Sequence, residues 1–217
     1  LPGGSHRFWI GSRSSSPAVE VMIDSDTIAM RSGDRVETIR SLRSNQWHNL
    51  QLTLDLKSGT VSGSVGLPDD VVTIPSRHLA KAWNGTIDFV AIDSPGNTDV
   101  PGIAIDNLGV QDRPIAPVSR ELPATPSASR ELDFAVLAAE LQSLAGIDGD
   151  FELQTDGQAP ATPWGPGPNS VVKIRAGAQS PFRNLFPSGE LGVHLPNSGA
   201  YNGFGQTLPN RWKASQT

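Results

Sequence analysis

The chain has 217 residues, a net charge of −5 and no cysteine, and its length suits one large β-sandwich or two small domains. Its charges are scattered and form no basic patch, which disfavours nucleic-acid binding, while the lack of cysteine excludes disulfides, zinc–thiolate sites and thiol nucleophiles. No apolar run approaches the roughly 20 residues that a transmembrane helix needs, so no membrane span is predicted.

Short apolar runs follow one another through the first half of the chain and predict an antiparallel series of strands. They cover residues 7–10, 19–23, 27–30, 36–39, 47–56, 60–65, 86–92 and 103–110. Asp24-Ser25-Asp26 predicts a tight hairpin turn, and residues 93–99 predict a loop. The 22 glycines and 18 prolines of the chain favour an all-β fold with many turns, because these residues supply the backbone angles that turns need.

The strongest strand signal is the run that begins at Trp47. Leu50, Leu52, Leu54 and Leu56 alternate with polar residues, so a strand would place all four leucines on one face. Residues 57–59 then predict a turn and 60–65 a return strand. A hairpin with one wet face belongs to an antiparallel sheet, and Trp47 is expected in its core.

The chain changes character after residue 112. Residues 113–129 contain four prolines among small and polar residues and predict an extended linker. Residues 130–146 predict the one short helix, capped by Ser129 and ended by Gly146, with Phe134, Leu137, Leu141 and Leu144 in an apolar stripe that packs on a neighbour. Residues 147–217 return to short strands, at 171–174 and 191–195, and to loops, with an irregular polar end from residue 202.

Four stretches together resemble the last strands of concanavalin A-like (laminin-G-like) domains. They are Trp47-His48-Asn49-Leu50-Gln51-Leu52-Thr53-Leu54-Asp55, Gly59-Thr60-Val61-Ser62-Gly63, Trp83-Asn84-Gly85 and Ile105-Asp106-Asn107-Leu108. Such domains occur as accessory modules of large secreted bacterial proteins. The resemblance therefore implies that residues 1–112 are the closing strands of an all-β, antiparallel jelly-roll sandwich, in a protein that is secreted or on the cell surface.

Residues 147–217 resemble the opening strands of a similar sandwich, on Gly149-Asp150-Phe151-Glu152, Trp164-Gly165, Gln179-Ser180-Pro181-Phe182, Gly189 and Gly192-Val193-His194-Leu195-Pro196. A closing half would then precede an opening half. Either the chain is an excerpt cut across two tandem domains, or the halves pair within it as a permuted sandwich. We favour the excerpt and hypothesise that the halves still pack together, because half a sandwich leaves an apolar face and sheet edges uncovered.

No set of residues forms a convincing catalytic constellation. Glucanases of this broad fold alternate two glutamates and an aspartate on one strand, because an acid and a nucleophile must flank the glycosidic bond. Glu131 and Asp133 come nearest but fall in the predicted helix, and Asp148, Asp150 and Glu152 fall in a loop that enters a strand. The histidines are scattered and a Gly-x-Ser-x-Gly elbow is absent. The chain is therefore expected not to be an enzyme.

A calcium site is the cofactor that the resemblance suggests, because laminin-G-like domains often hold one Ca²⁺ through loop carboxylates and carbonyls. Asp93, Asn97 and Asp99 share a predicted loop and Asp106 lies on the next strand, which would supply the oxygen ligands that calcium requires. Asx turns and backbone hydrogen bonds explain the same residues without a metal.

Sugar binding would require exposed aromatic rings beside polar groups. The aromatic residues available are Trp9, Trp83, Trp164, Phe182, Tyr201 and Trp212, and any one of them could instead pack in the core. Trp83 beside Asn84 is the preferred candidate, with Trp9 and Tyr201 next. The expected function is a non-catalytic module that binds a polysaccharide or glycan, or mediates adhesion, next to other domains of the same parent chain. The alternatives are a structural spacer, a protein–protein interaction module or a glycoside hydrolase-like domain.

Overall fold

The computed structural model describes residues 6–32, 35–95, 102–110, 151–167, 170–177, 191–196 and 201–213. Within these ranges the chain is all-β, with thirteen strands and no helix. The strands form three sheets, and every pair of neighbouring strands is antiparallel. The predicted all-β, antiparallel class is therefore confirmed for this part of the chain, which also has no helix long and apolar enough to cross a membrane.

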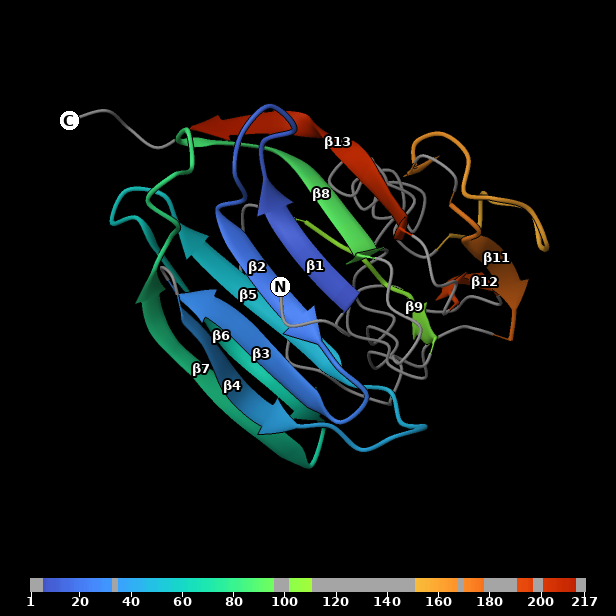
Figure 1. Ribbon diagram of the computed structural model, residues 1–217, viewed down its shortest axis with the longest axis horizontal. Helices are drawn as coiled ribbons and strands as arrows, with labels where there is room; N and C mark the ends of the chain where they lie inside the picture. The colour runs from blue at the N-terminus through green and yellow to red at the C-terminus, as the bar shows by residue number, and fades with distance from the viewer. Residues whose placement is uncertain are drawn as a thin grey trace, which may run out of the picture.

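The largest sheet has seven strands. Their order is β10 (Gly165–Pro166), β13 (Tyr201–Lys213), β8 (Thr86–Pro95), β1 (His6–Gly11), β2 (Val19–Ile23), β3 (Thr27–Ser32) and β4 (Arg35–Ser41). A three-stranded sheet of β5 (Asn49–Asp55), β6 (Thr60–Leu67) and β7 (Asp70–His78) lies behind it in Figure 1. The third sheet, in the order β11 (Lys173–Ala176), β12 (Leu191–Leu195) and β9 (Ile103–Ile105), lies to one side.

The leucine-rich hairpin forms as its alternation predicts. β5 pairs with β6 from Asn49↔Gly66 to Asp55↔Thr60, and Leu50, Leu52, Leu54 and Leu56 all pack against the core. Asp55 Oδ1 accepts hydrogen bonds from the backbone N–H groups of Lys57 (2.9 Å) and Ser58 (3.1 Å) in the turn. Hydrogen bonds from Ser58 lower the pKa of Asp55. Gly59 completes the turn with a positive φ of 66°, which glycine adopts without strain.

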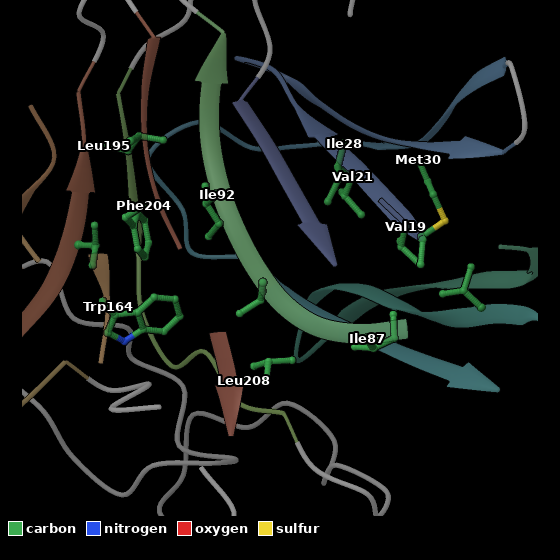
Figure 2. Close-up of a cluster of buried hydrophobic side chains, with 14 of the residues drawn as sticks. Val19, Val21, Ile28, Met30, Ile87, Ile92, Trp164, Leu195, Phe204 and Leu208 are labelled. Carbon is green, nitrogen blue, oxygen red and sulfur yellow. The ribbon is translucent and has the colours of Figure 1, made fainter. Parts of the chain in front are cut away.

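The seven-stranded sheet and the β5–β6–β7 sheet pack face to face around one apolar core. β2 and β3 contribute Val19, Val21, Ile28 and Met30, and β6 and β7 contribute Val61, Val65 and Ile74, all at most 4% exposed. The inward residues alternate with outward ones along each strand, as in a β-sandwich. Figure 2 shows the β2 and β3 side chains at one end of this cluster and Trp164, Phe204 and Leu195 at the other.

The late part of the chain belongs to the same core. β13 pairs with β8 along its length, from Tyr201↔Pro95 to Lys213↔Thr86, and β12 pairs with β9. Phe151, Trp164 and Phe204 form an aromatic cluster with ring centroids 5.3–6.1 Å apart. Described segments from the early and late parts of the sequence thus share sheets and a core.

Ion pairs join the seven-stranded sheet to the β5–β6–β7 sheet where β4 and β7 lie side by side (Figure 1). Arg40 Nη2 lies 2.8 Å and Arg43 Nη2 3.5 Å from Asp70 Oδ2, and Arg77 pairs with Glu37. The hydrogen bond from Arg40 is the main cause of a lowered pKa at Asp70. These pairs are half-exposed, so each adds little to stability and together they cover an otherwise open edge.

Several predicted boundaries are wrong. β8 continues to Pro95 where the sequence predicts a loop from residue 93, and β13 spans 201–213 where it predicts an irregular end. β7 is a strand that the sequence analysis missed, and β9 ends at Ile105 rather than at 110. The linker at 113–129 and the helix at 130–146 lie outside the described residues.

The same physical cause explains the errors in β8 and β13. The end of β8 contains Asp93 and Pro95, and β13 contains glycines, asparagines and a proline, all residue types with low β-propensity. Gly203 and Gly205 nonetheless fit because β8 lies so close that an added Cβ would come within 2.7–2.8 Å of its atoms. The register shift between Thr207 and Trp212 accommodates Pro209, since a bulge tolerates a residue without an N–H. Pairing with β8 therefore overrides local propensity.

Candidate functional site

The outward face of the seven-stranded sheet carries charged and aromatic residues beside one another. Phe8 and Ile10 of β1 pack against the core, so Arg7 and Trp9, which alternate with them, lie on the opposite face. Arg7 is paired with Asp93 in the register of β1 and β8. We call this surface, formed by the outward residues of β1, β2, β3, β8 and β13, the outer face.

Arg7 is at the centre of an ion network on the outer face. Its Nε lies 2.9 Å from Asp93 Oδ1 and its Nη2 2.6 Å from Asp93 Oδ2, so the guanidinium contacts both carboxylate oxygens. Arg7 Nη1 also donates to Glu20 Oε1 at 3.0 Å, and Glu20 accepts a further bond from Arg31. Burial acts to lower the pKa of Arg7, but its hydrogen bonds to Asp93 and Glu20 and their charges outweigh that effect and raise it.

The indole of Trp9 is part of this network. Trp9 Nε1 donates to Asp93 Oδ2 at 3.1 Å, and the Arg7 guanidinium lies 5.7 Å from the centre of the indole. The buried carboxylate of Asp93 is thus surrounded by a cation and an N–H donor, which compensates for its burial. The arrangement fixes the orientation of the Trp9 ring on the outer face.

Aromatic contacts continue from Trp9 along β8. The rings of Trp9 and Phe89 have centroids 5.0 Å apart, and the guanidinium of Arg13 lies 5.2 Å from the centre of the Phe89 ring. Phe89 is 8% exposed and Arg13 is exposed. The buried ring of Phe89 therefore contacts both the half-buried Trp9 ring and the exposed guanidinium of Arg13.

A depression of about 260 Å³ adjoins Phe89. The depression is lined by apolar residues, by polar residues and by two glycines. The apolar residues are Phe89, Pro163 and Trp164, the polar ones are Arg13, Thr162, Gln206 and Thr207, and the glycines are Gly165 and Gly205. Gly205 has no side chain to fill the space, and a Cβ there would come within 2.8 Å of Phe89 and Ala91. More of the depression's exposed surface is polar than apolar, so hydrogen-bonding groups dominate it and the aromatic rings add a smaller apolar part. We call this feature the β13 depression.

The predicted ligand residues are placed differently from one another. Trp83 is half-buried against the core and its Nε1 donates to the Thr86 carbonyl oxygen at 2.6 Å. Asn84 Oδ1 accepts from the Thr86 N–H at 3.0 Å. Both side chains thus stabilise the turn that leads into β8, and ligand binding by them stays a prediction. Trp9 lies on the outer face, whereas the side chain of Tyr201 is outside what the structure describes.

The predicted calcium ligands are only partly described. Asp93 is held by Arg7 and Trp9, and Asp106 Oδ1 accepts from the Asn107 N–H at 2.8 Å. Asn97 and Asp99 lie outside the described residues. Among the side chains that the structure does describe, no group of three or more histidine, aspartate or glutamate residues could hold a metal ion.

Of the remaining candidates, Trp164 packs in the core at 2% exposure, beside the β13 depression. Glu152 Oε1 accepts a hydrogen bond from the Leu191 N–H at 2.7 Å, so this carboxylate holds β12 in place. The side chain of Trp212 is not described. Glu131, Asp133, Asp148, Asp150 and Phe182 belong to parts of the chain outside the described ranges.

Sequence reasoning missed Arg13, Phe89 and Gly205 as neighbours in one site. Phe89 lies in a run read only as a strand, Arg13 in a loop, and Gly205 in a segment read as irregular. Only the registers of β1 and β13 with β8 bring the three together. No local pattern could have indicated the depression, because its residues come from four separate segments of the chain.

No family model, curated protein or solved structure matches the chain. The function is therefore argued from the geometry of the outer face alone.

Proposed function

We propose that this chain is a non-catalytic carbohydrate-binding module of a secreted multidomain protein, built as a concanavalin A-like jelly roll. The β13 depression is the observation that carries the proposal. Its volume of about 260 Å³ is below the range of sites for drug-sized molecules and would suit a single sugar ring. Apolar surface from Phe89 and Pro163 would meet the C–H face of the ring, and Thr162 and Thr207 would accept or donate hydrogen bonds to its hydroxyls.

The surroundings of the depression support a binding role rather than a catalytic one. The nearest buried carboxylate, Asp93, is already engaged by Arg7 and Trp9, and a glycosidase needs two carboxyl groups that flank the bond. Trp9 continues the aromatic surface beside Phe89 and would contact a second sugar residue of a longer chain. A polysaccharide, rather than a monosaccharide, is therefore the expected ligand.

Titration calorimetry of the chain against a panel of neutral and acidic polysaccharides tests this proposal. Thr207→Trp places a bulky ring at the depression, where Thr207 is exposed, and is expected to abolish binding. Thr38→Trp adds the same ring at an exposed position of β4 in the same sheet and is expected to leave binding unchanged. The proposal fails if no polysaccharide binds, or if the two variants behave alike.

A further inference from the structure

Arg13 is the one cationic side chain among the residues that line the β13 depression. It is exposed, and its guanidinium lies over the Phe89 ring, with 5.2 Å between Cζ and the ring centre. A cation over an aromatic face is held by the ring's negative charge distribution. This contact uses none of the N–H donors of the guanidinium, so they stay available for a ligand.

Arg13 has no acidic partner, unlike most of the arginines that the structure describes. Arg7, Arg31, Arg40, Arg43 and Arg77 all form ion pairs with Asp or Glu. Within the described ranges, Arg13 forms no ion pair and no side-chain hydrogen bond. An exposed arginine that is ordered by stacking and lacks a carboxylate is suited to bind one from a ligand, because the guanidinium fork matches carboxylate geometry.

The charges near Arg13 do not oppose an anion. On the outer face, the carboxylates of Asp93 and Glu20 are paired with Arg7 and Arg31. With these two carboxylates engaged by Arg7 and Arg31, Arg13 adds a positive charge without an acidic partner beside this face, on a chain whose net charge is −5. On a chain of net negative charge, an acidic ligand would be attracted to Arg13, which would favour one orientation of binding.

We propose that the β13 depression binds an acidic sugar unit, with its carboxylate in the guanidinium fork of Arg13. This inference rests on the carbohydrate binding proposed above and specifies the class of polysaccharide. The sugar ring would lie over the apolar surface, and its carboxylate would receive two parallel N–H bonds. A sulfate ester has similar oxygens that the Arg13 guanidinium could also bind. The test therefore uses separate ligands for a sugar carboxylate and for a sugar sulfate.

The decisive experiment compares oligogalacturonate with its fully methyl-esterified form, which keeps the sugar chain and removes its charge. Calorimetry with the chain should show binding of the acid and at least about tenfold weaker binding of the ester, since a charge-assisted hydrogen bond contributes roughly that factor. A sulfated dextran and a neutral β-glucan complete the set. Binding of the acid should also weaken as salt concentration rises.

Two variants assign the effect to Arg13. Arg13→Gln should weaken binding of the acid about tenfold and leave binding of the ester unchanged. Arg175→Gln is the matched control, because Arg175 is also exposed and free of ion pairs in the described part of the chain but lies on β11, outside the depression. Because Arg13 is exposed, its replacement should not change the melting temperature, which a thermal scan checks.

The outcomes separate this inference from the proposed function. Binding of the neutral glucan or the ester as tightly as the acid would overturn the acidic-sugar inference and leave carbohydrate binding intact. The same follows if Arg13→Gln and Arg175→Gln weaken the acid equally, or if only the sulfated dextran binds. Absence of binding to every ligand of the set, acidic and neutral, would overturn both.

Discussion

The two faces of the seven-stranded sheet are built from alternate residues of the same strands, and they differ in what they contribute. The inner face is a continuous apolar surface, with Val21, Met30, Ile92 and Phe204 at most 3% exposed. The outer face has an ion network, two aromatic rings in tilted contact and a depression. Folding requires the first face, because burial of apolar surface is the main driving force.

The outer face contains more specific chemistry than a solvent-exposed sheet surface needs. A solvent-exposed sheet face needs only scattered polar residues. Here the buried carboxylate of Asp93 accepts hydrogen bonds from Arg7 and from the indole of Trp9. The comparison indicates that stability should fall most on substitution in the apolar core, and less at the close strand contact, the ion network and the sheet edge, whereas substitutions at the depression should change binding. Four variants test the order of the stability effects, from the largest expected change to the smallest.

Phe204→Ala should have the largest effect on stability. Phe204 is 3% exposed and contacts the rings of Phe151 and Trp164. Loss of a buried phenylalanine leaves a cavity and costs about 3–5 kcal/mol of the free energy of unfolding, which urea denaturation measures. A loss below about 1 kcal/mol, as expected for an exposed site, would show that this residue does not belong to the core.

Gly203→Ala should disturb the contact between β13 and β8. An added Cβ would lie 2.7 Å from both Asp93 Cβ and the Ile92 carbonyl oxygen, and such overpacking costs about 1–3 kcal/mol. Gly165→Ala on β10 is the control, because the nearest atom to its Cβ is 4.0 Å away. Equal denaturation midpoints for the two variants would contradict the close approach of the strands.

Asp93→Asn should destabilise the outer face by about 1–2 kcal/mol, because Arg7 would lose a charged acceptor while keeping Glu20. The loss should exceed that of Glu20→Gln, since Asp93 is more buried and also accepts the Trp9 N–H. Denaturation of Arg7→Ala, of Asp93→Asn and of the variant with both substitutions measures the coupling. Additive losses would show that the two side chains do not interact.

Acid should weaken the ion pairs between β4 and β7. The pKa of Asp70 is lowered in the folded chain by Arg40, from an ordinary value of 3.8. The stabilisation is therefore complete above that value and is lost as the pH falls through the lower folded pKa. Asp70→Asn should reduce the fall of the melting temperature between about pH 5 and pH 3. An unchanged acid dependence would exclude Asp70 from this edge.

The predictions from sequence succeeded where a strand carries its own pattern. The run at β2 predicts a strand, and the leucines of β5 predict both a strand and its inward face, because alternation encodes burial within a single segment. They failed at β13, whose glycines and proline give no such signal. Its position depends on β8, a strand more than a hundred residues earlier in the chain.

The candidate site follows the same division. Trp9 was a ligand candidate from its residue type, and it does lie on the outer face beside Phe89. Arg13 and Gly205 gave no signal, since an arginine in a loop and a glycine in a polar segment are ordinary. They become neighbours only through strand pairing. Because β1 and β13 flank β8, the Arg13 guanidinium, the Phe89 ring and Gly205 line the same depression.

The sequence by itself determined the all-β class, the antiparallel hairpins and the inward side of the strongest strands. Those properties depend on residues two positions apart, which one short segment contains. The tertiary structure alone decided that β13 joins β8, that the early and late parts share a core, and that a depression forms on the outer face. These features depend on contacts between distant segments, and long-range pairing is set by the packing of whole sheets rather than by any local pattern.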